Sequence, residues 1–134
     1  MRNLSFFALL MLLFSCSLGK QYDICIYGGT SAGVIAARTA ALQGHSVVIV
    51  EPLDYIGGMT TGGLGQTDIG NKQVVQGLSR KFYRDLGSHY GSLEKWVFEP
   101  SVATTIFERY LDHPNITVLQ KTGLCSRHLL LCPL

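Results

Sequence analysis

The sequence predicts an α/β fold with a parallel β-sheet, because three segments follow one another in the order strand, helix, strand. Residues 22–27 form a short apolar run with β-branched side chains, and residues 47–50 form a second run that is entirely apolar. Between them, residues 31–43 are rich in alanine and other good helix formers. Strands of a parallel sheet are covered on both faces and therefore lack polar alternation. Such an order of elements is a βαβ unit.

The first predicted strand, residues 22–27, ends abruptly at Gly28 and Gly29, which is typical of a buried strand that runs into a tight turn. We expect Cys25, inside this strand, to be a buried and chemically inert thiol. The helix that follows is expected to stop at Gly44, since glycine is common just beyond a helix C-terminus.

A glycine-rich segment at residues 56–70 interrupts the regular pattern. It contains six glycines and almost no charge, so it cannot form a regular helix, and it is too long for a simple connection. Loops of this length in a compact domain usually serve a function. We therefore expect this segment to contribute to a binding site.

Two helices and a third strand are predicted beyond the glycine-rich segment. The first helix, residues 76–86, gathers its apolar side chains on one face: Leu78, Phe82 and Leu86. The second is expected to use Ser101 as its N-cap and to run to about Leu111, with an apolar stripe of Val102, Ile106 and Tyr110. Residues 116–119 predict the third strand, and no element is predicted from Cys125 onward.

Composition and cysteine spacing exclude two classes of partner. The 134 residues, 47% of them hydrophobic, allow one ordinary domain, and 11 Lys+Arg against 9 Asp+Glu leave no basic track for a nucleic acid. The cysteines form neither a CxxC pair nor a Cys/His cluster, so no metal or iron–sulfur site is predicted: Cys16, Cys25, Cys125 and Cys132.

Residues 1–19 have the layout of a secretory signal peptide. Arg2 precedes an apolar run over residues 4–18, and small residues end at Gly19, where we expect cleavage. The run is shorter than the ~20 residues that a membrane-spanning helix needs. We therefore predict an exported protein, periplasmic or secreted. The residues before Cys16 also loosely match a bacterial lipoprotein box, and lipidation at Cys16 is the one predicted route to a membrane.

The six residues 28–33 form the candidate site for a dinucleotide. A pyrophosphate is held by backbone amides at a helix N-terminus, and glycine is needed where a side chain would block its approach. Gly28 and Gly33 match the first and third glycines of G-x-G-x-x-G, whereas Thr30 occupies the second. Glu51 ends the next strand, 23 residues after Gly28, where a carboxylate accepts hydrogen bonds from ribose hydroxyls and disfavours a 2′-phosphate.

The motif and its surroundings resemble the bacterial FAD-dependent oxidoreductase family, whose broader relatives include heterodisulfide reductase-like proteins. The resemblance covers essentially Tyr22 to Leu119 and rests on residues 22–33, 51–52, 56–64, 67–72, 77–80 and 96–100. It implies a Rossmann-type FAD-binding fold over residues 20–124, with FAD as the cofactor. Residues 125–134 depart from the family pattern and form an atypical tail.

The resemblance also implies which residues contact FAD. It places the first loop at the pyrophosphate, the acidic strand end at the adenosine ribose, and the second glycine loop toward the flavin. The implied cofactor-binding residues are Gly28, Gly29, Thr30, Ser31, Ala32, Gly33, Glu51, Pro52, Gly57, Gly58, Met59, Thr60, Thr61, Gly62 and Gly63. No catalytic residue is identified.

Members of the family are several times longer, so the resemblance implies the N-terminal FAD-binding portion of an exported oxidoreductase, with truncation or a frameshift near Gly123 explaining the tail. The substrate or redox partner is not specified.

Two alternatives stay open. An NAD-dependent dehydrogenase fragment would use the same βαβ unit and Glu51 but leaves the second glycine loop without a task. A non-catalytic truncated nucleotide-binding module is the other.

Overall fold

The computed structural model describes residues 20–67, 70–125 and 130–133, so the predicted signal peptide, residues 1–19, lies outside the described residues. Three strands form a parallel sheet in the order β1 (Ile24–Tyr27), β2 (Val47–Val50) and β3 (Ile116–Leu119). Both neighbours of the central strand β2 pair with it in parallel, and all four of its residues are buried. The predicted α/β class and Rossmann-type arrangement are confirmed.

The edge strand β1 is less buried than the sequence predicts. Ile24 and Ile26 face the core beneath the first helix, whereas Tyr27 is 56% exposed and Cys25 is exposed as well. Side chains alternate between the two faces of a strand, so Cys25 and Tyr27 share the face that the helix does not cover. The expectation of a buried Cys25 is therefore wrong.

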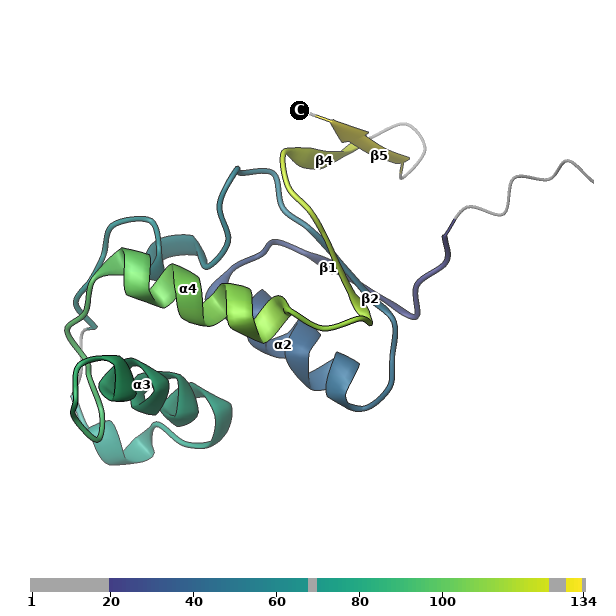
Figure 1. Cartoon of the computed structure of the whole chain (residues 1–134). Helices are drawn as coiled ribbons and strands as arrows, with labels where there is room; N and C mark the ends of the chain where they lie inside the picture. Colours follow the sequence, from purple (N-terminus) through teal and green to yellow (C-terminus); the bar gives the residue numbers. More distant parts are fainter. Residues whose placement is uncertain (1–19, 68–69, 126–129, 134) are drawn as a thin grey trace, which may run out of the picture.

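Three helices pack on one another beside the sheet: α2 (Ser31–Leu42), α3 (Gly77–His89) and α4 (Pro100–Leu111). Helix α4 contacts both α2 and α3 and runs above them in the view of Figure 1. Buried aromatic rings hold α3 to α4, since Phe82 stacks on Phe107 at 4.6 Å between ring centroids. The expected cap at Ser101 is wrong: Pro100 occupies the first helical position, where its fixed backbone angle suits the helix.

The tail beyond β3 contains an element that the sequence did not predict. Strands β4 (Thr122–Cys125) and β5 (Leu130–Pro133) pair in an antiparallel ladder (Figure 1). Short apolar runs do not distinguish strand from irregular chain by periodicity, which explains the missed element. Two short 3₁₀ turns, η1 (Gly58–Thr60) and η2 (Lys72–Val74), complete the described structure. Within the described ranges, no helix has the length and apolar character to cross a membrane.

A polar network around Asp85 joins the helices. Lys81 and the hydroxyl of Tyr110 donate hydrogen bonds to its carboxylate, while Arg38 of α2 donates to the backbone carbonyl of Tyr110. Burial by itself raises the pKa of Asp85, but the hydrogen bonds from Lys81 and Tyr110 outweigh it, and the pKa lies below its ordinary value. Burial and the Asp85 carboxylate raise the pKa of Tyr110, so its hydroxyl keeps the proton that it donates.

We expect acid to destabilise the fold through Asp85. Because its folded-state pKa lies below the unfolded value of about 3.9, the carboxylate contributes stability above that value and loses it as the pH falls through the folded-state pKa. Asp85→Asn should lower the melting temperature at neutral pH and flatten its decline in acid. Thermal melting between about pH 7 and about pH 3 measures both effects. Parallel melting curves for the two proteins would contradict the prediction, and Asp112→Asn, at an exposed position, is the control.

Candidate functional site

The two glycine-rich loops meet at the carboxyl ends of β1 and β2. Gly28 donates its amide to the carbonyl of Val50 at 2.8 Å, which fixes the first loop to the end of β2. Gly57 of the second loop donates its amide to the carbonyl of Gly29 at 2.7 Å. A β-bridge between Thr30 and Gly57 continues this contact. Main-chain hydrogen bonds therefore hold together two segments that the sequence separates by more than twenty residues.

The first loop requires glycine at two positions for different reasons. Gly28 has a φ of +100°, a conformation that side chains rarely adopt. Gly33 has ordinary helical geometry, but a Cβ atom there would overlap the carbonyl oxygen of Gly28. The tight approach of α2 to the end of β1 thus depends on both glycines, as the motif predicts.

The N-terminus of α2 presents free amides in its first turn, although Thr30 serves as its N-cap. The Thr30 hydroxyl accepts a hydrogen bond from the Gly33 amide at 3.2 Å, and its carbonyl accepts one from the Val34 amide at 2.9 Å. The amides of Ser31 and Ala32, in the first turn, have no acceptor inside the helix. They lie where the positive end of the helix dipole favours an anion. The departure from G-x-G-x-x-G at Thr30 is therefore a capping residue in the place of a glycine.

We predict that Thr30→Ala destabilises the protein by about 1 kcal/mol, because it removes the hydroxyl that accepts from the Gly33 amide. Thr30→Ser keeps a capping hydroxyl and should stay close to the unchanged protein. Urea unfolding of the ligand-free chain measures the difference. An equal loss of stability in both variants would show that the methyl group of Thr30, and not its hydroxyl, stabilises the protein.

Glu51 is buried at the end of β2, with 6% of its surface exposed. Its Oε2 accepts the Gly29 amide at 2.6 Å and its Oε1 accepts the Leu53 amide at 2.8 Å. An ionised carboxylate has about four acceptor positions, and the hydrogen bonds from Gly29 and Leu53 use two of them. Glu51 therefore shapes the first glycine loop in addition to any contact with a ligand, a role that the spacing of the motif did not reveal.

A groove of about 470 Å³ runs between the two loops. Seven of the residues implied by the sequence line it: Thr30, Ser31, Gly57, Gly58, Met59, Thr60 and Gly62. Three further lining residues were missed, namely Leu53, Tyr55 and Leu64, which are 49%, 40% and 61% exposed. Leu53 and Tyr55 lie between Glu51 and Gly57, and Leu64 follows Gly63, but no motif marks these three as ligand contacts.

The remaining implied residues surround the groove without lining it. Gly28, Gly29, Gly33 and Glu51 form its support through the contacts described above, and Ala32 lines a neighbouring hollow. Thr61 donates its hydroxyl to the carbonyl of Ile56 and so stabilises the second loop. Neither Pro52 nor Gly63 borders the groove.

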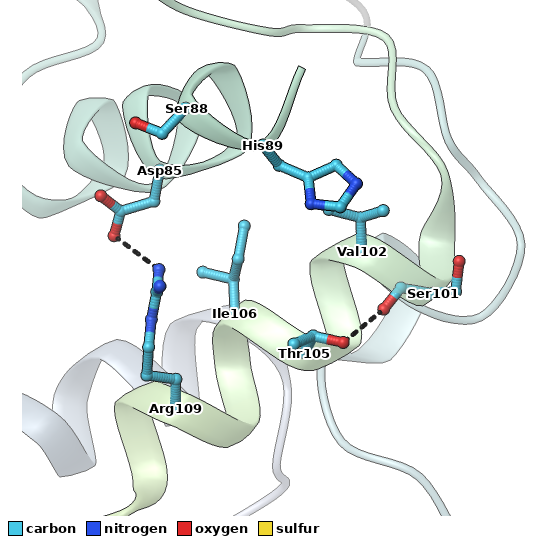
Figure 2. Close-up of a pocket in the computed structure, with 8 residues that line it drawn as sticks. All are labelled: Asp85, Ser88, His89, Ser101, Val102, Thr105, Ile106 and Arg109. Atoms are coloured by element: carbon cyan, nitrogen blue, oxygen red, sulfur yellow. Dashed lines mark hydrogen bonds and ion pairs between the residues drawn. The ribbon is translucent and has the colours of Figure 1, made fainter. Parts of the chain in front are cut away.

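A separate hollow of about 470 Å³ lies between α3 and α4 (Figure 2). Arg109 and Asp85 form an ion pair across it at 3.6 Å, and the Thr105 hydroxyl donates to the carbonyl of Ser101 within α4. Arg109 is 65% exposed, so the pair contributes little to stability. None of its lining residues belongs to either glycine loop, so it is not part of the candidate site.

The residues that line the groove and those that support it fit a dinucleotide such as FAD. Free amides at the N-terminus of α2 suit a pyrophosphate, and a buried carboxylate with spare acceptor positions suits ribose hydroxyls. Small residues leave the backbone open to a ligand, and exposed apolar side chains offer surface for a ring system.

Comparison with known proteins gives the same assignment. The model of the family described as FAD dependent oxidoreductase matches residues 23–128. A 3-oxosteroid 1-dehydrogenase of Mycolicibacterium smegmatis is 40% identical over 58 residues, 43% of this chain and 10% of that protein. A 3-oxosteroid 1-dehydrogenase of Mycobacterium tuberculosis is 36% identical over 66 residues, 49% of this chain and 11% of that protein. The matched segments thus span about a tenth of these relatives.

A solved structure supports the fold. The crystal structure of THI4 from Thermovibrio ammonificans superposes with a TM-score of 0.50 at 18% identity, over 97% of this chain and 52% of that chain. At this level of identity the likeness concerns the fold alone. The sheet, the helix after β1 and the loop between them are the parts of the chain that position the groove.

Proposed function

Because this chain belongs to the FAD-dependent oxidoreductase family, we propose that it is the FAD-binding portion of an exported oxidoreductase. The observation that carries the proposal is the meeting of two glycine loops at a groove beside the buried Glu51. A single glycine loop would suit many nucleotides, whereas the second loop supplies a continuous wall for a longer cofactor. Family membership favours FAD over NAD as that cofactor.

In this proposal the residues that line the groove and those that support it have defined tasks. The amides of Ser31 and Ala32 bind the pyrophosphate, and Glu51 accepts hydrogen bonds from the adenosine ribose. Residues 57–63 provide backbone and small side chains toward the flavin. FAD supplies the electron-transfer chemistry when bound, and the chain binds it, orients it and limits the access of water. The residues of the groove do not specify the substrate or the redox partner.

The first experiment measures FAD binding by the full chain. We expect the purified protein to retain a visible flavin absorbance band or to gain it when FAD is added, and FAD to raise its melting temperature more than NADH does. A colourless protein that ignores FAD would overturn the proposal. Preferential stabilisation by NADH would support the dehydrogenase alternative.

One substitution separates cofactor binding from folding. Ala32→Glu places a negative charge at an exposed position in the first turn of α2, where it favours the helix but repels a pyrophosphate. We expect a stable protein that has lost FAD binding. Leu42→Glu adds the same charge at an exposed position in the last turn of α2 and should leave FAD binding unchanged.

Export is proposed from residues 1–19, whose charge and apolar run follow the layout of a signal peptide. Expression of the chain with its own N-terminus in a bacterial host, followed by cell fractionation and mass spectrometry, tests it. Cleavage after Gly19 indicates a secretory signal, whereas a lipid-modified Cys16 indicates an anchor. An uncleaved chain that stays in the cytoplasm contradicts both forms of the proposal.

A further inference from the structure

We propose that a hollow between α2, α3 and α4 binds an uncharged, ring-bearing small molecule that reacts at the FAD site. The inference rests on the proposed function, because it names the class of ligand that would meet the cofactor. The hollow has a volume of about 430 Å³, within the range of small-molecule pockets. Residues from all three helices and from η1 line it.

The hollow adjoins the cofactor groove. Ser31 and Thr60 line both. Ser31 is the first residue of α2, where the pyrophosphate is expected, and Thr60 ends η1 of the second glycine loop. A molecule in the hollow would therefore lie against the same two residues as the cofactor. This position suits a reaction partner better than an unrelated ligand.

The lining determines the chemistry of the ligand. Ile35, Phe82 and Phe107 supply aliphatic and aromatic surface, and the stacked rings of Phe82 and Phe107 are buried, which makes a firm floor. Among the described residues that border the hollow, none has a carboxylate, ammonium, guanidinium or imidazole group. A cation would lose its hydration here without gaining an opposite charge, and an anion would meet the negative pyrophosphate that the amides of Ser31 and Ala32 are proposed to bind when FAD is present. An uncharged ring system is the ligand that fits.

Side chains with hydroxyl groups also line the hollow and can orient a bound ligand. Ser79 and Tyr83 of α3 line the hollow beside Thr60. The Tyr83 hydroxyl accepts a hydrogen bond from the Thr67 hydroxyl at 3.2 Å, which leaves its own proton to donate to a ligand. A ketone or hydroxyl oxygen on the ring system is the matching group. Few polar groups in an apolar pocket are the usual means of fixing the orientation of a ligand.

A tryptophan next to the hollow can report ligand binding through its fluorescence. Trp96 is the single tryptophan of the sequence, and its ring stacks on Tyr83 at 3.8 Å between centroids. It is 7% exposed, so its emission depends on its protein neighbours more than on solvent. A ligand that contacts Tyr83 should change this emission. Binding can therefore be followed without any measurement of turnover.

The test titrates the full chain with testosterone, which has fused rings, a ketone, a hydroxyl and no charge. Testosterone hemisuccinate carries a carboxylate through an ester on that hydroxyl, and its methyl ester is the uncharged probe of matched size. Trp96 emission and equilibrium dialysis are measured with and without bound FAD. With FAD bound, we expect the methyl ester to bind roughly tenfold more tightly than the hemisuccinate, with testosterone bound as well and the flavin absorbance retained. Equal affinities would overturn the inference, as would release of FAD by testosterone, which would show that the cofactor fills the hollow.

Two substitutions test the position of the ligand. Ala36→Phe fills the hollow from an exposed position of α2 and should weaken testosterone binding roughly tenfold or more. Leu42→Phe, at an exposed position on the same helix that does not border the hollow, is its control. Ser79→Asp adds a charge in the first turn of α3, where a carboxylate favours the helix, so we expect its melting temperature to be retained while testosterone binding weakens. Ser79→Asn is its neutral counterpart.

The outcomes separate this inference from the proposed function. A chain that binds testosterone but no FAD contradicts the proposed function and not the ring-binding hollow. A chain that binds FAD but shows no testosterone binding contradicts the hollow alone. Binding that survives unchanged in Ala36→Phe places the probe elsewhere and also overturns the inference.

Discussion

Gly57→Ala is expected to destabilise the ligand-free protein by about 2–4 kcal/mol and to abolish the cofactor groove. Gly57 has a φ of +107°, which strains any residue with a Cβ atom. A Cβ here would also lie 2.6 Å from the Thr61 hydroxyl oxygen and 2.9 Å from the Phe107 ring. Phe107 is buried at 1% exposure, so it has no free space to move into. Chemical unfolding and FAD titration measure the two consequences.

Gly63→Ala separates backbone strain from the steric overlap. Gly63 has a similar φ of +122° in the same loop, but a Cβ added there meets nothing within 4 Å. Gly63→Ala should lower the free energy of unfolding only by the cost of the strained backbone conformation, about 1 kcal/mol. If the two variants lose the same stability, the close packing of Gly57 against Thr61 and Phe107 is not what fixes the loop.

The sequence predicted the framework of the fold because local pattern and burial agree there. Residues 47–50 are wholly apolar, and the strand they form is buried on both faces. The same logic failed at Cys25, because an apolar run does not reveal whether its strand lies at the centre or the edge of a sheet. Position in a sheet depends on partners distant in sequence. The prediction of Ser101 as the N-cap of α4 was wrong for a local reason, because Pro100 starts the helix one residue earlier.

For the candidate site, spacing predicted which segments matter but not what each residue does. Thr30 was a mismatch to the motif until its hydroxyl was found to cap α2. The hydrogen bond between Gly57 and Gly29 joins loops that no local pattern relates, so the contact of Tyr55 with the groove was not predictable either. Motifs report the residue types that a ligand requires, whereas the support behind them depends on tertiary contacts.

Glu51→Leu should destabilise the protein by about 2–5 kcal/mol even without FAD, because it leaves the amides of Gly29 and Leu53 without their acceptors. Each unpaired buried group costs about 1–3 kcal/mol. Glu51→Gln keeps one carbonyl oxygen but turns an amide nitrogen toward the other N–H, so its loss should lie between those of Leu and the unchanged protein. Unfolding of the ligand-free chain ranks the three proteins.

The ligand-free measurement distinguishes the two tasks of Glu51. If Glu51 only contacted the adenosine ribose, both variants would lose FAD affinity while the ligand-free protein kept its stability. If the variants lose both FAD affinity and ligand-free stability, the carboxylate holds the first glycine loop in the shape that the pyrophosphate requires. Asp54→Asn is the control, since the Asp54 side chain is 67% exposed and its ion pair with Lys121 spans 3.8 Å, so its removal should leave stability and binding unchanged. The Glu51 carboxylate would then be required in the ligand-free protein as well, because it holds the first glycine loop in the conformation that binds FAD.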